Sequence, residues 1–345
     1  MSKPKITIII PVYNVEQYLR QCLDSVVNQT MREIQIICVN DGSPDNSRSI
    51  LQEYADKDSR IEIIDKTNGG ISSARNAAYP HIRGKYTLFI DSDDWLELDL
   101  CEKTYQKSEI TGAEMTVFFY SKEQDGSCPM SHISLQDKVT IEDKLPVLTH
   151  PTAWSKLWRT DFLLDNKLYF PEGLVWEDNL VHWQAVTLAE KISVLPEQLY
   201  HYRFRPASIM QISENSMQVI PIYSKIYEFL LESGYYATYR EEFILRKLHV
   251  WCRHYSFLPT TMKPRFAAMI RESLTADDWQ FLCIASKKQL SNTARLFYKM
   301  LDGSRTDALK YHFFESIKLP EQFLRKWIIK PIKKRLKAAK LHNSK

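Results

Sequence analysis

The chain carries an apolar run that leads directly into three aspartates, Phe89-Ile90-Asp91-Ser92-Asp93-Asp94-Trp95. Successive side chains of a strand point to opposite faces, so Asp91 and Asp93 are expected on one side and Ser92 on the other. Two like charges in one small volume need a compensating cation or donors, and Mg²⁺ or Mn²⁺ bound to a diphosphate meets that need. The alternative is an acidic loop, and for Asp94 we favour it, as the cap of the following helix.

Apolar runs and helix-like stretches alternate through the first 120 residues. Strands are expected at 6–10, 34–39, 61–64, 86–90 and 115–119, and helices at 15–28, 47–55, 71–79 and 98–108. The strands are continuous Ile/Val/Phe runs, which is typical of a mainly parallel sheet with helices on both faces. The pattern predicts an α/β fold in which ligands bind beyond the carboxyl ends of the strands.

The remainder of the chain is first irregular and then helical. Prolines and a glycine interrupt 121–175, a helix is expected at 177–190, and short strands are expected at 192–195 and 199–204. From about residue 217 the apolar spacing is helical. We therefore divide the chain into a domain over 1–210 with parts at about 1–120 and 121–210, a helical region over 211–318 and a tail over 319–345.

Charge and cysteine usage limit the class of protein. The formal charge of +4 conceals a tail with nine Lys/Arg and the single acid Glu321, a distribution that argues against a nucleic-acid-binding body. Six scattered cysteines without a C-x-x-C pair predict reduced thiols. Because no apolar stretch of about 18 residues occurs, we expect a cytoplasmic protein that does not span a membrane.

Four ordered motifs resemble family 2 glycosyltransferases of the GT-A fold, over roughly residues 5 to 210. They are Ile8-Ile9-Ile10-Pro11-Val12-Tyr13-Asn14 with Glu16, Val39-Asn40-Asp41-Gly42-Ser43-Pro44-Asp45, Asn68-Gly69-Gly70-Ile71-Ser72-Ser73-Ala74-Arg75-Asn76, and the Asp91-Ser92-Asp93-Asp94 group. The resemblance implies a Rossmann-like GT-A catalytic domain over 1–210. It also implies an inverting, metal-dependent transfer of a hexosyl or N-acetylhexosaminyl group from a UDP-sugar.

The same resemblance implies a role for each motif residue. Tyr13 would lie against uracil and Asp41 would accept a hydrogen bond from its imide, while Arg75 would meet the diphosphate. Asp91 would hold the ribose and Asp93 would ligate Mn²⁺ or Mg²⁺. Further contacts to the nucleotide-sugar are implied at Pro11, Glu16, Asn68, Gly70 and Ser92. Singly these signals are weak, because Tyr13 could be a packing residue and Asp41-Gly42 an ordinary turn.

A dinucleotide-binding protein would need G-x-G-x-x-G in the first strand-to-helix turn. That turn is Pro11-Val12-Tyr13-Asn14-Val15-Glu16 and holds no glycine. A Walker A loop is missing as well. The sequence therefore argues against NAD-dependent and P-loop functions.

A second candidate site is the acidic pair Glu177-Asp178 at the start of the helix expected at 177–190. Inverting transfer needs a base that removes the acceptor hydroxyl proton, and the resemblance implies Asp178 in this role, with Glu177 as its neighbour or acceptor contact. The alternative is that acids simply favour the first turn of a helix.

A third segment, Tyr200-His201-Tyr202-Arg203-Phe204-Arg205, is similar to an element that follows the base in many family members. Arg203 or Arg205 could neutralise charge on the leaving diphosphate. His201 could complete the metal shell, although a packed histidine is the more common case. Aromatic side chains and one lysine surround the expected acceptor region, namely Trp154, Lys156, Trp158, Trp176 and Trp183; Ser155 replaces the asparagine usual in the family.

The tail over 319–345 alternates apolar and basic residues, which favours docking on the anionic inner face of a membrane. A solvated basic helix or a contact with another protein would give the same pattern. Family and tail together imply a lipid-linked glycan acceptor in capsule, O-antigen or exopolysaccharide synthesis. A catalytically inactive, nucleotide-sugar-binding partner of an assembly complex is the alternative; the sugars and the oligomeric state do not follow from the sequence.

Overall fold

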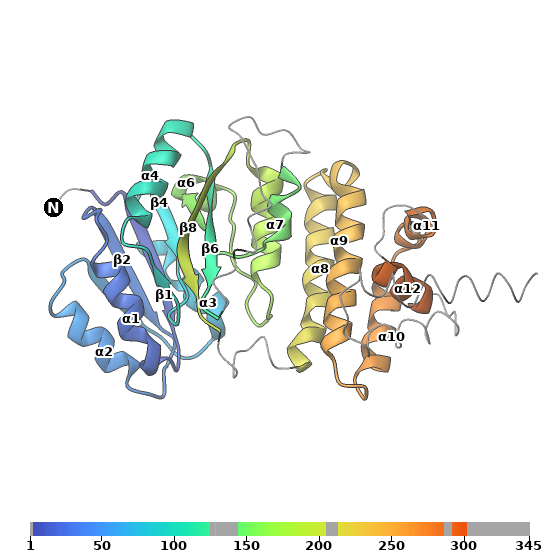
Figure 1. Ribbon diagram of the computed structural model, residues 1–345, viewed down its shortest axis with the longest axis horizontal. Coiled ribbons are helices and arrows are strands. Elements are labelled where there is room, and N and C mark those ends of the chain that lie inside the picture. The colour runs from blue at the N-terminus through green and yellow to red at the C-terminus, as the bar shows by residue number, and fades with distance from the viewer. Residues whose placement is uncertain (1–2, 125–127, 129–143, 205–212, 286–291, 302–345) are drawn as a thin grey trace, which may run out of the picture. The chain divides into compact units, whose positions relative to one another are not determined.

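The computed structural model describes residues 3–124, 128, 144–204, 213–285 and 292–301 (Figure 1). The chain forms two compact units, Met1–Tyr239 and Arg240–Lys345. The predicted boundary after residue 210 falls within the first unit. The tail over 319–345 and Arg205 lie outside the described residues.

An eight-stranded sheet in the order β3-β2-β1-β4-β7-β6-β8-β5 forms the centre of the first unit. The strands are β1 (Ile6–Val12), β2 (Ile34–Asn40), β3 (Ile61–Asp65), β4 (Tyr86–Phe89), β5 (Trp95–Leu96), β6 (Met115–Lys122), β7 (Lys156–Arg159) and β8 (Ile192–Tyr202). Neighbours from β3 to β4 are parallel, as are β6 and β8, whereas β7 and β5 run antiparallel to their partners. The predicted α/β fold with a mainly parallel sheet is confirmed.

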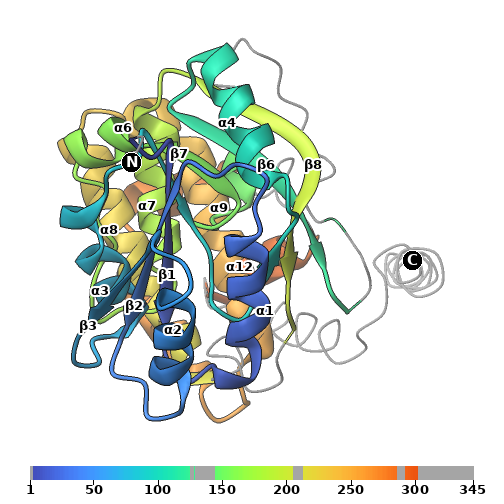
Figure 2. The same cartoon turned by 90° about the vertical axis from the view of Figure 1, so that its left-hand side faces the viewer.

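Helices cover this sheet. They are α1 (Glu16–Val27), α2 (Ser47–Ala55), α3 (Gly70–Ala77), α4 (Leu100–Thr111), α6 (Thr160–Asp165) and α7 (Asp178–Leu188), with short 3₁₀ turns at Tyr79–His81, Val147–Thr149 and Ser213–Gln218. The helix α8 (Val219–Glu232) packs against α7. In Figure 2, α1 and α2 lie on one face of the sheet and α3 on the other, as right-handed crossovers require. The strands β1 and β2 are buried along their whole length, which explains their continuous apolar sequence.

The described part of 121–175 contains a strand that the sequence did not predict. This strand is β7, whose residues pair with β4 on one side and β6 on the other. In place of the two short strands expected at 192–195 and 199–204, the structure has the single strand β8, and its pairing with β6 shifts register near Phe118 and Phe119. Local periodicity could not reveal either feature, because both depend on partners that are distant in sequence.

The second unit is helical where the structure describes it. Its helices are most of α9 (Tyr236–Phe257), which begins in the first unit, then α10 (Lys263–Ser273), α11 (Ala276–Ala285) and α12 (Asn292–Leu301). A buried ion pair joins Lys247 of α9 to Asp278 of α11 at 2.6 Å. Within the described residues, no helix combines the length and apolarity needed to cross a bilayer.

Candidate active site

The three aspartates lie in a turn beyond the end of β4. The strand ends at Phe89, and the Asp94 N–H donates to the Asp91 carbonyl at 3.0 Å, which closes the turn. Because the chain has already left the sheet, strand alternation does not govern which way Asp91 and Asp93 point. Ser92 between them is buried. The sequence placed the aspartates at the end of a strand, as the structure has them, but Asp91 and Asp93 belong to a turn and not to the strand itself.

Asp94 is not a helix cap, and that prediction was wrong. The strand β5 follows it directly, and α4 begins later, after Asp99. Asp94 is buried, accepts a hydrogen bond from the Tyr200 hydroxyl at 2.5 Å and another from the Arg203 N–H at 2.7 Å. Burial, reinforced by the charge of Asp93, raises its pKa well above the ordinary value. Asp94 therefore anchors the turn to the end of β8.

Arg203 also holds the turn in place. Its Nε donates to the Asp93 carbonyl at 2.8 Å, and its remaining donors reach Glu123 and Gln21. The guanidinium lies 4.7 Å from the centre of the Trp95 ring. These contacts place Arg203 beside the aspartates, as the sequence suggested, but with its donors engaged by the protein.

His201 is a packed residue in this structure. Its ring stacks on Trp95 at 5.0 Å, and its two ring nitrogens lie within hydrogen-bond distance of Ser121 at 2.9 Å and Glu97 at 2.8 Å. Both nitrogens thus have protein partners. The contacts favour the packing interpretation of His201 over metal ligation.

Asp41 follows β2 and faces the start of α3. One carboxylate oxygen accepts from Lys66 Nζ at 2.7 Å and from the Gly69 N–H at 3.0 Å, and the other accepts from the Gly70 N–H at 2.8 Å. Gly70 has φ +85°, a left-handed value that suits glycine. Since each carboxylate oxygen can accept two hydrogen bonds, the second oxygen retains capacity for a further donor. Sequence analysis gave no role to Lys66, although a lysine directly after a strand and before Asn68 was a usable signal.

The segment after β1 is connected to the segment after β2. The Glu16 N–H donates to Asp45 at 2.9 Å, and the Glu16 carboxylate accepts from the Asn46 N–H at 2.8 Å. Tyr13 lies between the end of β1 and Glu16 and is 48% exposed, so its ring is available to a ligand. Pro11 lies beyond the part of β1 that pairs with β4, where a missing N–H interrupts no bond to that strand. Glu16 thus has a structural role beside any contact to a ligand.

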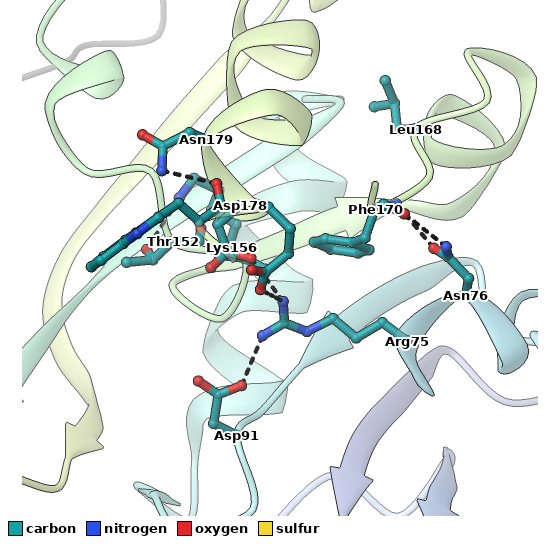
Figure 3. A network of polar contacts seen from close by, with 12 residues as sticks. Arg75, Asn76, Asp91, Thr152, Lys156, Leu168, Phe170, Asp178 and Asn179 are labelled. Carbon is teal, nitrogen blue, oxygen red and sulfur yellow. Dashed lines mark hydrogen bonds and ion pairs between the residues drawn. The ribbon is translucent and has the colours of Figure 1, made fainter. Parts of the chain in front are cut away.

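Arg75 gathers three carboxylates from two parts of the chain (Figure 3). Its Nη2 donates to Asp91 at 2.9 Å, and its Nη1 donates to Glu177 at 2.8 Å and Asp178 at 2.7 Å. The side chain is 1% exposed and lies against the Phe170 ring, 4.8 Å from its centre. Its Nε has no hydrogen-bond partner among the described residues. The guanidinium expected at the diphosphate is therefore committed to carboxylates in this structure.

Glu177 and Asp178 begin α7 and differ in environment. Burial, reinforced by the charge of Asp178 and opposed by Arg75, raises the pKa of Glu177 to about 8. Asp178 is more exposed than Glu177, and its second oxygen accepts from the Ala153 N–H at 3.0 Å. Near neutral pH Glu177 thus retains a proton, which leaves Asp178 as the better general base of the pair.

The preceding residue, Trp176, has φ +72°, a value that is unusual for a large side chain. Its indole N–H donates to the Asn215 carbonyl at 2.9 Å. The other tryptophans of this region, Trp154, Trp158 and Trp183, are buried. Ser155 is likewise fully buried, so its hydroxyl lies in the core and not on a surface that an acceptor could reach.

Oxygen ligands suitable for a hard divalent cation are present at the aspartate turn. Burial, opposed by Arg75 and reinforced by Asp93, raises the pKa of Asp91 to about 6. Asp93 is half-buried and carries the central carboxylate of the turn. Mg²⁺ and Mn²⁺ bind through one or two carboxylates together with substrate phosphates, and this set of donors fits them. Among the described residues, no group of three or more His, Cys, Asp or Glu side chains is arranged to hold a metal ion.

The site residues thus form two groups at the carboxyl ends of the strands. Tyr13, Glu16 and Asp41 lie after β1 and β2. The hydrogen bonds of Arg75 bring Asp91 together with Glu177 and Asp178.

The architecture resembles that of solved glycosyltransferases. The crystal structure of S. aureus TarS 1-349 in complex with UDP-GlcNAc superposes with a TM-score of 0.71 over 90% of both chains at 21% identity. The mannosyltransferase PcManGT from Pyrobaculum calidifontis, in complex with GDP-Man and Mn²⁺, gives a TM-score of 0.52 at 12% identity. At such identities the likeness concerns the fold, and it confirms the predicted GT-A architecture.

Sequence comparisons give closer relatives. The putative glycosyltransferase EpsH of Bacillus subtilis is 34% identical over 262 residues, which cover 70% of this chain and 74% of EpsH. Glycosyltransferase GlyA of Streptococcus pneumoniae is 37% identical over 222 residues, 60% of this chain but 32% of GlyA, so the match spans about a third of that relative. Residues 7–160 match the model of glycosyl transferase family 2. The chain therefore belongs to glycosyl transferase family 2.

Proposed function

We propose that the protein transfers a sugar from a UDP-sugar to a hydroxyl of a cell-surface glycan, with inversion at the anomeric carbon. The observation that carries the proposal is the hydrogen-bonded group in which Arg75 joins Asp91, beside the expected donor site, to Asp178. Asp178 is thereby held close to the turn that would contact the donor. A base in that position can act on an acceptor hydroxyl that approaches the anomeric carbon.

The proposed reaction is a single displacement. Asp178 takes the proton of the acceptor hydroxyl as the oxygen forms a bond to the anomeric carbon. The bond from that carbon to the diphosphate breaks, and UDP leaves with the electron pair. Asp93 would hold Mg²⁺ or Mn²⁺, which supplies charge neutralisation at the diphosphate when bound.

Two observations support a uridine nucleotide. Asp41 retains acceptor capacity at the end of β2, where it can meet an imide N–H, and Tyr13 exposes a ring on which a base can stack. The structural neighbour TarS has been solved with UDP-GlcNAc and with UDP. Thermal unfolding measured with UDP-sugars and GDP-sugars in the presence of Mn²⁺ tests the choice of base. Protection by GDP-sugars alone would contradict the role of Asp41.

The decisive test of catalysis is UDP release by Asp178→Asn. Asparagine keeps the shape of the side chain but cannot take a proton, so we expect turnover to fall at least ~10²-fold. Asp161→Asn is the matched control, because Asp161 also lies in the first turn of a helix and pairs with an arginine, Arg159. If the wild-type protein binds UDP-sugar but releases no UDP with any acceptor offered, the alternative of an inactive assembly partner is the better account.

We propose further that the acceptor is lipid-linked and that the basic segment 319–345 docks on the cytoplasmic face of the inner membrane. Each Lys or Arg near an anionic surface contributes about 1 kcal/mol of attraction. Removal of 319–345 should abolish sedimentation with vesicles that contain anionic lipid, while UDP-sugar binding remains. Unchanged sedimentation would support a protein that works away from the membrane.

A further inference from the structure

A fully buried lysine contacts the loop that holds the candidate base. Lys156 begins β7 and is 0% exposed. Its Nζ donates to the carbonyls of Thr152 and, at 3.2 Å, of His150, and lies 3.2 Å from the Ser155 hydroxyl. A buried amine must have its donors satisfied, and all of these acceptors belong to the loop 150–155. Lys156 therefore fixes the shape of that loop.

The loop in turn contacts the base. The Ala153 N–H donates to Asp178 Oδ2 at 3.0 Å, while Arg75 Nη1 donates to Oδ1 at 2.7 Å from the other side. Figure 3 shows Lys156 and Thr152 on one side of Asp178 and Arg75 on the other. Each carboxylate oxygen thus has one fixed donor and keeps a second acceptor position.

We propose that Lys156 is a positioning residue for Asp178, holding the loop 150–155 so that the Ala153 N–H orients the carboxylate toward the acceptor hydroxyl. The role rests on the proposed function, since it presupposes that Asp178 is the base. Without the amine, two loop carbonyls lose their donor, and the loop no longer presents the Ala153 N–H at its present position. Arg75 still holds the other oxygen, so the base would be misaligned and not lost.

The charge of Lys156 adds a second effect. Burial, opposed by Asp178, lowers the pKa of Lys156 to about 7, so the amine is charged on the acid side of neutrality. The other titratable or charged groups near Asp178 are Arg75 of α3, Glu177 directly before α7 and Asp91 of the turn. His182 of α7 is occupied by a contact to the Val147 carbonyl at 2.9 Å. On the acid side of neutrality, removal of Lys156 therefore also takes away a positive charge close to the base.

The test compares Lys156→Met with Lys247→Met in the full chain. Lys247 is also a buried lysine beside a carboxylate, but it lies in the helical unit. For Lys156→Met we expect kcat to fall at least ~10-fold and the KM for UDP-sugar to stay within ~2-fold. Lys247→Met should lower the melting temperature without lowering kcat at temperatures where the variant is folded.

Thr152→Val is a second, less disruptive variant. It removes the Thr152 hydroxyl, which lies 3.4 Å from Lys156 Nζ and also contacts Ser155. It should lower kcat in the same sense and to a smaller degree, and it decides the question if Lys156→Met does not fold. Wild-type values of kcat in the folded variants would overturn the role of Lys156 and leave the proposed function intact. Absence of turnover in the wild-type protein would overturn the proposed function, and this role with it.

Discussion

Arg75→Ala removes the guanidinium that three carboxylates share. Arg75 is 1% exposed, and its partners lie at 2.7 to 2.9 Å. Breaking a buried ion pair by deleting one partner costs about 3–5 kcal/mol, because the remaining charges stay buried without compensation. Against a typical unfolding free energy of about 5–15 kcal/mol, this loss is large but leaves a folded population to measure. Arg75→Lys keeps the charge, but a single amine cannot reach both Asp91 and the Glu177-Asp178 pair, so this variant should regain only part of the lost stability.

The assay is urea unfolding followed by tryptophan fluorescence at several pH values. Arg75 lowers the pKa of Glu177, which still reaches about 8, so the variant raises that pKa further. The folded variant then binds more protons than the unfolded chain from about pH 4.5 up to a higher pH than the wild type does. Its unfolding free energy must therefore continue to fall with rising pH beyond the pH at which that of the wild type levels off. Arg20→Ala is the control, since it breaks an exposed pair with Glu53 and should leave stability unchanged. A loss below about 1 kcal/mol, or a loss independent of pH, would refute the idea that Arg75 offsets the charge of these carboxylates.

Three further predictions test single features of the site. Glu177→Gln should flatten the pH dependence of the melting temperature between pH 5 and 8. Folding of the wild type takes up a proton in this range, so its stability falls by up to about 1.4 kcal/mol per pH unit as pH rises. Identical slopes in the two proteins would contradict the raised pKa of Glu177. Tyr13→Ala should weaken UDP binding in calorimetry about 10-fold, since stacking on a base contributes about 1–3 kcal/mol, and an unchanged affinity would remove Tyr13 from the site. Tyr200→Phe should destabilise the protein by about 1–3 kcal/mol in urea unfolding, because the buried Asp94 loses one of its two donors, whereas Tyr235→Phe at an exposed position should not.

Much of the sheet could be predicted because its strands are buried along their length. The run at 34–39 predicted β2 (Ile34–Asn40) to within one residue, and the helix at 47–55 matches α2 (Ser47–Ala55). The strands β5 and β7 could not be predicted in this way. They comprise two and four residues, and they exist because β8, β4 and β6 offer them hydrogen-bonding partners far away in sequence.

In the candidate site, too, some features could be predicted from the sequence and others could not. Residue type and position after a strand identified the acidic turn and the Glu177-Asp178 pair. The contacts that these residues make could not be predicted from the sequence, because they join distant parts of the chain; Arg75 and Asp178, for example, lie 103 residues apart. Asp94 illustrates the difference, since its sequence context suits a helix cap, whereas tertiary packing buries it against Tyr200. Lys156 was likewise not predictable as the partner of the loop 150–155, whereas the position of Lys66 after a strand was a usable signal for its contact with Asp41.

The placement of β7 limits how this protein could be recombined with its relatives. In a chimera that takes the chain after residue 120 from a relative, the relative's β7 would have to pair with the β4 and β6 of this protein. Its side chains are adapted to the strands of the relative. The imported β8 would also have to pair with the native β5, which follows the aspartates directly. Exchange of acceptor specificity should therefore succeed when β6, β7 and β8 travel as one block with a matching Trp95–Leu96 edge, and should give insoluble protein when the cut separates them.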